Sequence, residues 1–554
     1  METEAVPNIS PAKITASLVD SLVQQFVGFE TICTDLLAQR RKMLRAILGK
    51  SNRSPFLWGV GSQNGSVDFV DAVQWMHGKV WQSRDLPAPP QGSIQLFGSR
   101  LREDLAAIAL AAYGGDASFY DGVDADETDL LSRPVESQLR CVELPLWKKL
   151  IAESDDDEPA SFLLHSMEEI VKHCLDADGW PESRIIADAA VLAASWCRCC
   201  DMFKFAGLQM DPDAYFMLCE LNQQLVRLSR DDGSLLLGEY SGGLNCNSFK
   251  KALSRNFSTS FLSQLKRRKK ASRRTREPAT CSISEWGQVG VLQSKWKLGG
   301  NKVAVAFGDQ RLKMDVSNGA SLVCGDCTPE ISINGVPQSI ESEIGVSGFL
   351  RFDKCDYLEL EMEFEAAVVQ RQLLFFAKDK LLFLNDVVTT KEASQIEYRN
   401  TLGLGSGFEL LRETENNEFY LKNGDVYSLV LPLSMPEWKT ERSDTSVEFN
   451  VESFAVSRQA DGLGFSTPIV FDLNPKRSQK PRTWRRLTVA ENMQTVGDDA
   501  AAAYRVQIGR DQWLFYRSVW ERGNRTFMGQ NYADEFFVGS IDCDGNVVPL
   551  VEIE

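Results

Sequence analysis

Histidine is the commonest general base and metal ligand in proteins, and it is scarce in this sequence. The chain has 554 residues and three histidines, His77, His165 and His173. His165 and His173 stand two helical turns apart, whereas two metal ligands on one helix usually stand about one turn apart. This spacing favours surface or core histidines. The scarcity argues against a Ser-His-Asp hydrolase and against a histidine-rich metalloenzyme.

Cysteine offers a second set of candidates, with two Cys-x-x-Cys spacings at Cys197–Cys200 and Cys324–Cys327. A four-thiolate zinc site would have to join two pairs that are widely separated and lie in different kinds of secondary structure. A redox pair would need its second cysteine to open a helix, and neither segment has that pattern. A phosphate-binding Gly-x-x-x-x-Gly-Lys-Ser/Thr loop is also absent from the sequence. We therefore predict reduced thiols, no metal and no cofactor.

The densest run of cations extends from Lys266 to Arg276 and holds Lys-Arg-Arg-Lys-Lys-Ala-Ser-Arg-Arg-Thr-Arg. Such a run is typical of an exposed linker between domains of an acidic protein. The alternative is a local site for an anionic polymer or for the acidic face of a partner protein. A nuclear-localisation signal has no other support in the sequence.

Composition and charge limit the class of protein. The chain is 43% hydrophobic and 25% charged, which is typical of globular proteins, and its length suggests two to four domains. Its net charge of −17 argues against a dedicated nucleic-acid binder. The acidic start has no apolar segment behind it, and no window is long enough to span a membrane. We expect a soluble cytoplasmic protein without a nucleic-acid or membrane partner.

The secondary structure that must position any site changes from helices to strands along the chain. Residues 1–265 show helical spacing. Ser10-Pro11 and Asp211-Pro212 each combine a capping residue with a proline at the first helical position. Apolar stripes at spacings of three and four predict helices, for example Leu163, Met167, Ile170 and Cys174, and Tyr215, Leu218, Leu221, Leu225 and Leu228.

From residue 281 onward the period becomes that of strands. Residues 356–365 alternate, and we expect a half-buried strand with its glutamates on an acidic outer face. Hairpin turns are predicted at three places: Lys378-Asp379-Lys380, Asn423-Gly424-Asp425 and Asp544-Gly545-Asn546. The sequence predicts a helical domain over 1–265, a basic linker over 266–280 and an antiparallel β-sandwich over 281–554.

Several short motifs follow one another in an order that resembles a known family. They are Glu285-Trp286-Gly287, Lys295-Trp296, Leu312-Lys313-Met314-Asp315, Tyr357-Leu358-Glu359-Leu360, Arg371-Gln372-Leu373-Leu374, Leu384-Asn385-Asp386-Val387, Gln512 to Ser518, Asn524-Arg525-Thr526 and Glu535-Phe536. With the helical first half, this order resembles the heparinase II/III-like polysaccharide lyases. The resemblance is clearest over 281–554, weaker over 180–245, and fades before that.

The resemblance implies an incomplete (α/α) toroid followed by an antiparallel β-sandwich, with the site in the cleft between them. It also implies β-elimination, in which a base removes the C5 proton of a uronate and an acid protonates the leaving oxygen. Cationic or amide groups neutralise the uronate carboxylate. The expected partner is an acidic poly- or oligosaccharide.

The family's catalytic tyrosine is best matched by Tyr240, in Glu239-Tyr240-Ser241-Gly242-Gly243. Its His-x-Asp segment corresponds to Lys313-Met314-Asp315, so a lysine replaces the histidine. A desolvated lysine can act as a base, and the alternative is an exposed strand lysine. For Tyr240 the alternative is a loop aromatic that packs between domains.

The resemblance also implies groups that bind the substrate. Arg311 is the candidate for the uronate carboxylate, Asp315 for an orienting or structural role beside it, and Asn245 for the family's toroid asparagine. Two hypotheses follow. The chain is a polysaccharide or oligosaccharide lyase, or it is a non-catalytic relative that serves as a glycan-binding or intracellular assembly scaffold. The missing histidine favours the second, and the order of the two domains permits the first.

Overall fold

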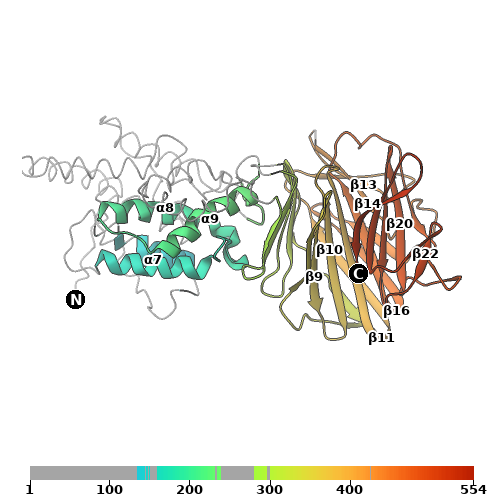
Figure 1. Ribbon diagram of the computed structural model, residues 1–554, viewed down its shortest axis with the longest axis horizontal. Coiled ribbons are helices and arrows are strands. Elements are labelled where there is room, and N and C mark those ends of the chain that lie inside the picture. The colour runs from blue at the N-terminus through green and yellow to red at the C-terminus, as the bar shows by residue number, and fades with distance from the viewer. Residues whose placement is uncertain are drawn as a thin grey trace, which may run out of the picture. The chain divides into compact units, whose positions relative to one another are not determined.

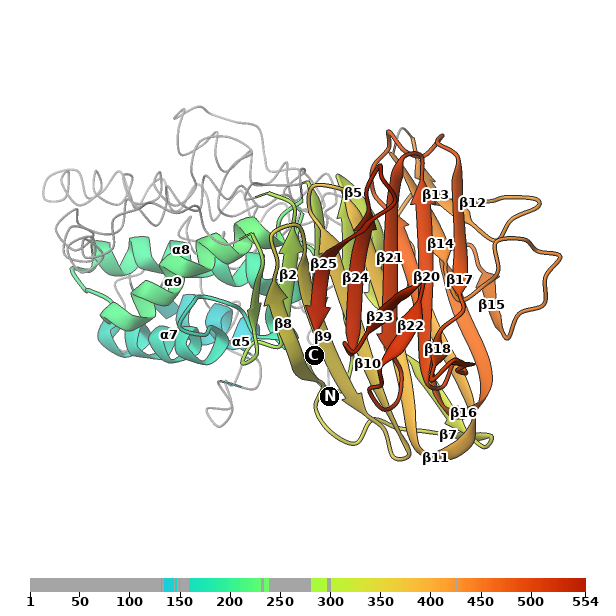
Figure 2. The same ribbon diagram turned by 45° about the vertical axis from the view of Figure 1, so that its right-hand side comes forward.

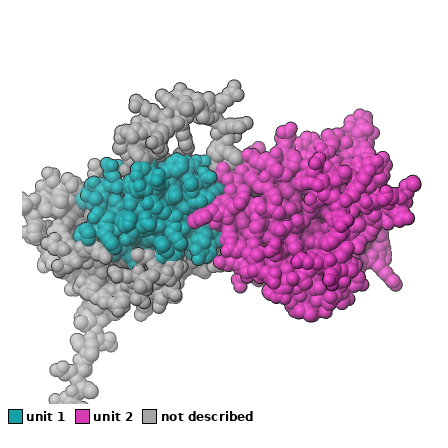
Figure 3. Space-filling view, turned by 60° about the horizontal axis from the view of Figure 1, so that its bottom comes forward, with its two compact units in different colours: residues 1–226, 232–275 teal, residues 227–231, 276–554 magenta. Residues whose placement is uncertain are grey.

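The computed structural model describes residues 131, 134–143, 145–146, 149, 159–230, 234–238, 280–295, 300–424 and 426–554. The chain divides into two compact units (Figure 3). Unit 1 comprises Met1–Val226 and Asp232–Thr275, and unit 2 comprises Arg227–Asp231 and Arg276–Glu554. The helices predicted before residue 100 and the linker segment 266–279 lie outside the described residues, so these stay predictions.

The described part of unit 1 is helical. Its elements are α5 (Pro134–Ser137), the π-helical turn η5 (Gln138–Glu143), α7 (Ala160–Cys174), the 3₁₀ helix η6 (Ser183–Asp188), α8 (Ala189–Phe205) and α9 (Pro212–Leu228) (Figure 1). The predicted apolar stripe of α7 is confirmed, because Leu163, Met167, Ile170 and Cys174 are all buried. The predicted cap of α9 is confirmed too, since Asp211 Oδ2 accepts a hydrogen bond from the amide of Ala214 at 3.2 Å. A toroidal arrangement of such helices stays a prediction.

A buried ion pair joins α8 to η5. The guanidinium of Arg198 on α8 donates to both carboxylate oxygens of Glu143, with Nη2 to Oε2 at 2.9 Å. Beside it, Trp196 Nε1 donates to Gln138 Oε1 at 3.1 Å. Cys199 lies in the same interior, and burial raises the pKa of its thiol well above the usual range. Burial likewise raises the pKa of the Cys200 thiol, and both side chains pack in the interior.

Unit 2 consists of antiparallel strands in several sheets. The first sheet is five-stranded and holds β1 (Ser282–Ser284), β2 (Val289–Gln293), β3 (Asn301–Ala306), β4 (Lys313–Asn318) and β5 (Ala320–Asp326). The large sheet holds β6 (Glu330–Ile333), β7 (Val336–Pro337), β8 (Gly345–Arg351), β9 (Asp356–Glu363), β10 (Ala367–Phe376), β11 (Leu381–Gly403), β12 (Glu409–Arg412), β13 (Phe419–Asn423), β14 (Val426–Pro432), β15 (Thr445–Phe449) and β16 (Ser453–Asp472). A third sheet holds β17 (Arg482–Leu487), β20 (Ala501–Ile508), β21 (Asp511–Ser518), β24 (Phe536–Ile541) and β25 (Val547–Ile553). A small fourth sheet holds β18 (Ala490–Glu491), β19 (Gln494–Thr495), β22 (Arg525–Phe527) and β23 (Gln530–Tyr532).

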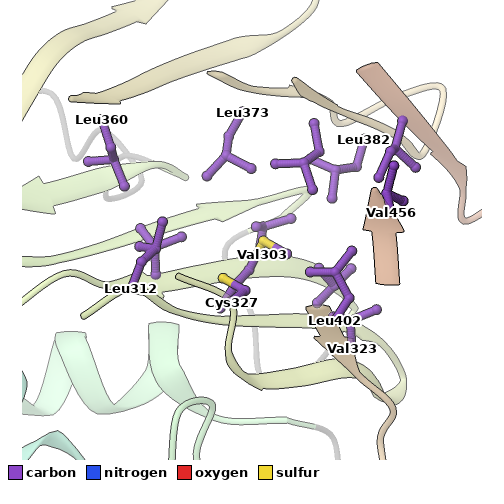
Figure 4. Close-up of a cluster of buried hydrophobic side chains, with 14 of the residues drawn as sticks. Val303, Leu312, Val323, Cys327, Leu360, Leu373, Leu382, Leu402 and Val456 are labelled. Atoms are coloured by element: carbon purple, nitrogen blue, oxygen red, sulfur yellow. The ribbon is translucent and has the colours of Figure 1, made fainter. Parts of the chain in front are cut away.

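The sheets of unit 2 stack in layers, with the large sheet covered on both faces (Figure 2). One face packs on the β1–β5 sheet, where side chains such as Val303 and Leu312 meet Leu360 and Leu373 (Figure 4). The other face packs on the third sheet, where Phe383 stacks on Phe515 with ring centroids 4.3 Å apart. The third sheet packs in turn on the small fourth sheet through a separate apolar cluster. Unit 2 thus has more layers than a two-sheet sandwich.

All three predicted hairpins are confirmed. Residues 378–380 join β10 to β11, and Lys380 has the positive φ of 54° that such a tight turn needs. The Asn423-Gly424 turn joins β13 to β14, and Gly545 lies in the turn between β24 and β25. Local turn chemistry therefore fixes the connections within two of the sheets.

The predicted acidic outer face of β9 is wrong in part. Glu363 and Glu365 are exposed, but Glu359 is 8% exposed because the third sheet covers this face of the large sheet. Glu359 accepts hydrogen bonds from Ser347 Oγ at 2.8 Å and from Gln372 Nε2 at 2.8 Å. A polar row continues from Gln372 across the neighbouring strands, because Asn385 Nδ2 donates to Gln372 Oε1 at 2.9 Å. Burial of a carboxylate is tolerated here because several donors bind it.

The opposite face of the large sheet contains a buried ion pair. Arg371 on β10 stands directly across from Asp386 on β11, and Nε donates to Oδ1 at 2.7 Å. Tyr398 donates to Asp386 Oδ2 at 2.6 Å, and Arg371 Nη1 donates to the carbonyl oxygen of Cys327 at 2.7 Å. Burial alone would lower the pKa of Arg371, but the adjacent Asp386 carboxylate raises it above its usual value. The guanidinium of Arg371 joins the large sheet to the segment after β5 through its bond to Cys327.

Asp386→Asn would remove the charged partner of a buried guanidinium. We expect the free energy of unfolding to fall by about 3–5 kcal/mol, because an uncompensated buried charge remains. The control is Arg399→Gln, which breaks the solvent-exposed pair with Glu448 (2.8 Å) and should cost less than about 1 kcal/mol. Urea denaturation followed by circular dichroism measures both. Equal losses in the two variants would contradict a structural role for the buried pair.

Candidate functional site

The predicted site residues fall into two groups. Lys313 and Asp315 lie on β4, and Arg311 lies in the turn that precedes it. Tyr240 and Asn245 lie outside the described residues. The structure therefore brings together three of the five candidates, and the roles of the other two stay predictions.

Strand β4 separates a polar face from an apolar one. Met314 and Val316 are buried in the core beneath the large sheet, and the intervening side chains of Lys313 and Asp315 point to the opposite face. We name this opposite surface the polar face of the β1–β5 sheet. By the register of β3, β4 and β5 it carries Lys302, Lys313, Asp315, Ser317 and Asp326.

Asp315 forms a buried ion pair with Arg230. Arg230 Nη2 donates to Asp315 Oδ2, and Ser321 Oγ donates to Oδ1 at 3.2 Å. The two ion-paired residues are 85 positions apart in the sequence, and Asp315 is 1% exposed. A carboxylate in this setting holds chain segments together and does not face a ligand in solvent. Its geometry favours the orienting role over direct contact with substrate.

Lys302 binds the same chain segment, residues 227–230, to which Arg230 belongs. Its ammonium nitrogen donates to the carbonyl oxygens of Arg227 at 2.8 Å and Ser229 at 2.7 Å, and the residue is 0% exposed. Helix α9 ends at Leu228, and the carbonyl groups at a helix end have no partner within the helix. A cation is favourable at such an end because the helix dipole is negative there. Lys302 and Asp315 together fix residues 227–230 on the polar face of the β1–β5 sheet.

Arg311 and Lys313 differ from these buried groups because both are exposed. Lys313 stands across from the exposed Asp326 on β5. Two exposed cations two residues apart suit an anionic group such as a carboxylate, and the planar guanidinium can bind it through two hydrogen bonds.

The turn before β4 determines the backbone position of Arg311. Asp309 and Gln310 have φ values of 55° and 56°, and the amide of Arg311 donates to the carbonyl oxygen of Gly308 at 3.1 Å. Two consecutive non-glycine residues in the left-handed region define a primed hairpin turn. Such conformations cost about 1 kcal/mol or more each and often occur at functional positions. The strain is consistent with a backbone that presents Arg311 in one position.

The Cys324–Cys327 pair lies beside this face without redox character. Burial raises the pKa of the Cys327 thiol to about 11, despite the opposing effect of Arg371, and burial likewise raises the pKa of Cys324. Reactive cysteines need a lowered pKa. Among the described residues, no group of three or more His, Cys, Asp and Glu side chains is arranged to hold a metal ion.

Neither Arg230 nor Lys302 was predicted from the sequence as a site residue. Lys302 carried a weak signal, because it interrupts an otherwise apolar strand, Asn301-Lys302-Val303-Ala304-Val305-Ala306. Ala304 and Ala306 follow it on the same face, where small side chains leave room for a covering segment. Arg230 carried no local signal, since its partner is remote in the sequence.

The fold of this chain is similar to several solved structures of polysaccharide lyases. The chain is similar to a mutant of the heparan sulfate lyase HepC from Pedobacter heparinus, with 10% identity and a TM-score of 0.49 over 82% of this chain and 79% of that chain. It is similar to heparinase III, with 11% identity and a TM-score of 0.49 over 81% and 82% of the two chains. It is also similar to the chondroitin AC lyase of Streptomyces coelicolor A3, with 11% identity and a TM-score of 0.33 over 93% and 90%.

These values are too low to carry a conclusion about family, activity or substrate. No protein-family model matches the sequence. No curated protein matches it either. Among the described helices, none has the length and apolar character that a membrane crossing requires.

Lys302→Met would remove the ammonium that binds the end of α9 while keeping the length of the side chain. We expect faster hydrogen–deuterium exchange in peptides covering 227–231, by roughly tenfold or more, because bonds from a charged donor are lost. Asp315→Asn should have the same effect through Arg230. Lys313→Met is the matched control on the same face, and it should leave exchange in 227–231 unchanged. Protection that persists in both test variants would show that other contacts hold this segment.

Proposed function

We propose that the chain is a polysaccharide lyase-like protein that binds an acidic poly- or oligosaccharide beside Arg311 and Lys313 and cleaves it by β-elimination. The observation that carries the proposal is the arrangement at β4. Two exposed cations stand at its start, and the next residue on the same face, Asp315, is held in a buried ion pair. Although the chain has a net charge of −17 and the exposed Asp326 stands across from Lys313, these two neighbouring cations offer a polyanion a local place to bind.

Elimination requires a base, an acid and a cationic partner for the substrate carboxylate. The base takes the proton from C5 of the uronate, and the electron pair of that C–H bond forms the C4–C5 double bond. The C4–O4 bond breaks, and the acid protonates the departing oxygen. The products are an unsaturated uronate end and a new hydroxyl end, so atoms and electrons balance without a cofactor.

In this proposal Tyr240 and Lys313 share the base and acid roles, as the resemblance to the heparinase II/III-like lyases implies. Arg311 and Asn245 bind the carboxylate and so stabilise the charge that develops at C5. Asp315 is a positioning residue, because its carboxylate is buried against Arg230.

The second candidate function is a non-catalytic glycan-binding or assembly scaffold. It is favoured by one observation, the exposed lysine at the position where the resembling family has histidine. An exposed lysine ammonium can bind the carboxylate of a glycan without any bond being cleaved. Both functions use the same exposed cations and differ in whether a bond is cleaved.

The test measures cleavage and binding separately on the full chain with a panel of uronate-containing polysaccharides. We expect the ultraviolet absorbance of the unsaturated product to rise, and Tyr240→Phe and Lys313→Met each to slow that rise by about 10²-fold or more. The control is Lys378→Met, an exposed lysine in the β10–β11 turn, which should leave the rate unchanged.

Binding without any rise in absorbance would support the scaffold function. Loss of that binding in Arg311→Met would then place it at β4. Neither cleavage nor binding across the panel, with a folded protein by circular dichroism, would contradict both functions.

A further inference from the structure

A cavity of about 190 Å³ is lined by residues of the large sheet, of the small fourth sheet and of loops that flank two strands of the third sheet. Its wall includes Leu463 of β16, Glu491 of β18 and Arg525 of β22. The rest of its lining comes from the turn before β20 and the segment after β21: Asp499, Ala500, Trp520, Glu521 and Arg522. We call this cavity the Trp520 pocket.

We propose that the Trp520 pocket binds one uncharged sugar ring, as a saccharide subsite separate from the exposed cations of β4. The saccharide class of the ligand rests on the proposed function, whereas the choice of an uncharged ring rests on the pocket. Pockets for drug-sized ligands measure about 300–1,000 Å³, so this smaller volume suits a single ring. The fourth sheet, which supplies Glu491 and Arg525 to the pocket, lies on the side of the stack away from the β1–β5 sheet (Figure 2).

Trp520 supplies an apolar surface that is open to solvent. The residue is 39% exposed although it belongs to the pocket wall. An indole ring combines a large apolar face with one N–H donor. The face of a sugar ring that carries C–H groups can pack on it, while the hydroxyl groups at the ring edge reach the polar wall.

The polar wall is built on a buried arginine. Arg525 is 3% exposed, and its Nη1 donates to Ser518 Oγ at 2.6 Å. Its Nη2 donates to the carbonyl oxygen of Glu521 at 2.6 Å, and its Nε donates to Glu491 Oε2 at 3.4 Å. Arg525 therefore fixes the pocket carboxylate of Glu491 and the backbone that carries Trp520 in one arrangement.

Two glycines leave room for the pocket carboxylates. A Cβ atom at Gly523 would stand 2.5 Å from Glu491 Oε1, and one at Gly497 would stand 2.5 Å from Asp499 Oδ1. Any side chain at either position would push the carboxylate away. The positions of both carboxylates thus depend on the backbone, and that of Glu491 depends on its pair with Arg525 as well.

The charges of the wall favour an uncharged ring over a uronate. Arg525 is paired with Glu491, which leaves Asp499, Glu521 and Arg522 with an excess of negative charge. A second carboxylate would be repelled, whereas hydroxyl groups can donate to carboxylates and accept from a guanidinium. These carboxylates do not make a metal site, since the described residues contain no metal-holding group of His, Cys, Asp and Glu.

The test titrates the full chain with glucose, mannose, galactose, xylose and N-acetylglucosamine and their short oligomers, using saturation-transfer NMR and calorimetry. We expect at least one of these sugars to bind, and Trp520→Ala to weaken its binding about tenfold or more. Gly523→Ala should weaken binding too, because it displaces the Glu491 carboxylate and deletes no polar group. The matched control is Trp438→Ala, another exposed tryptophan (45%) that does not line the pocket.

Two outcomes would overturn the proposal: no binding of any sugar in the panel to a folded protein, or equal losses in Trp520→Ala and Trp438→Ala. Lys313→Met separates this inference from the proposed function. This variant should lose cleavage or binding of the acidic polysaccharide, and its affinity for the uncharged sugar at the Trp520 pocket should be unchanged. If the uncharged sugar binds but neither the unchanged chain nor any variant binds or cleaves the acidic polysaccharide, the proposed function is contradicted and the inference about the Trp520 pocket stands.

Discussion

The structure of unit 2 depends on one constraint, the burial of the large antiparallel sheet on both faces. A sheet with one solvated face can place charged side chains in water, but this sheet cannot. Its buried charged side chains are therefore paired with side chains of neighbouring strands. Arg371 binds Asp386, and Glu359 accepts hydrogen bonds from Ser347 and Gln372. Each bound group ties its strand to a neighbour, so the apolar layers and the polar contacts between strands specify the same register.

The β1–β5 sheet meets the same constraint in a different way. Its apolar face packs on the large sheet, and its polar face receives the segment after α9 through Lys302 and Asp315. The buried groups of this face, Lys302 and Asp315, thus bind residues 227–230 of the chain itself. The side chains of Arg311 and Lys313 are exposed and accessible to a ligand. In the proposed function, this division separates the residues that position the chain from those that contact the saccharide, and a binding site needs both kinds.

The sequence allowed prediction of those features that depend on neighbouring residues. The hairpins at 378–380 and 423–425 follow from turn chemistry, and the stripe of α7 follows from its spacing. Features that depend on a second layer were not predictable. Glu359 looked like a solvated residue because alternation cannot reveal a covering sheet, and the Arg230–Asp315 pair joins residues 85 positions apart. Tyr240 and Asn245 were proposed from resemblance alone, and they stay predictions.

The Trp520 pocket and the β4 edge differ in the charge that surrounds them, and this difference constrains what one saccharide chain could do on both. At β4 the exposed groups are cations that attract a carboxylate, whereas the pocket wall combines an aromatic face with carboxylates that repel one. The two are built from different strands and loops of unit 2, so each keeps its own set of charges. A polymer that used both would have to alternate acidic and uncharged residues, or present them on separate branches. If both proposals hold, a saccharide with uronates alone binds at β4 and leaves the pocket empty.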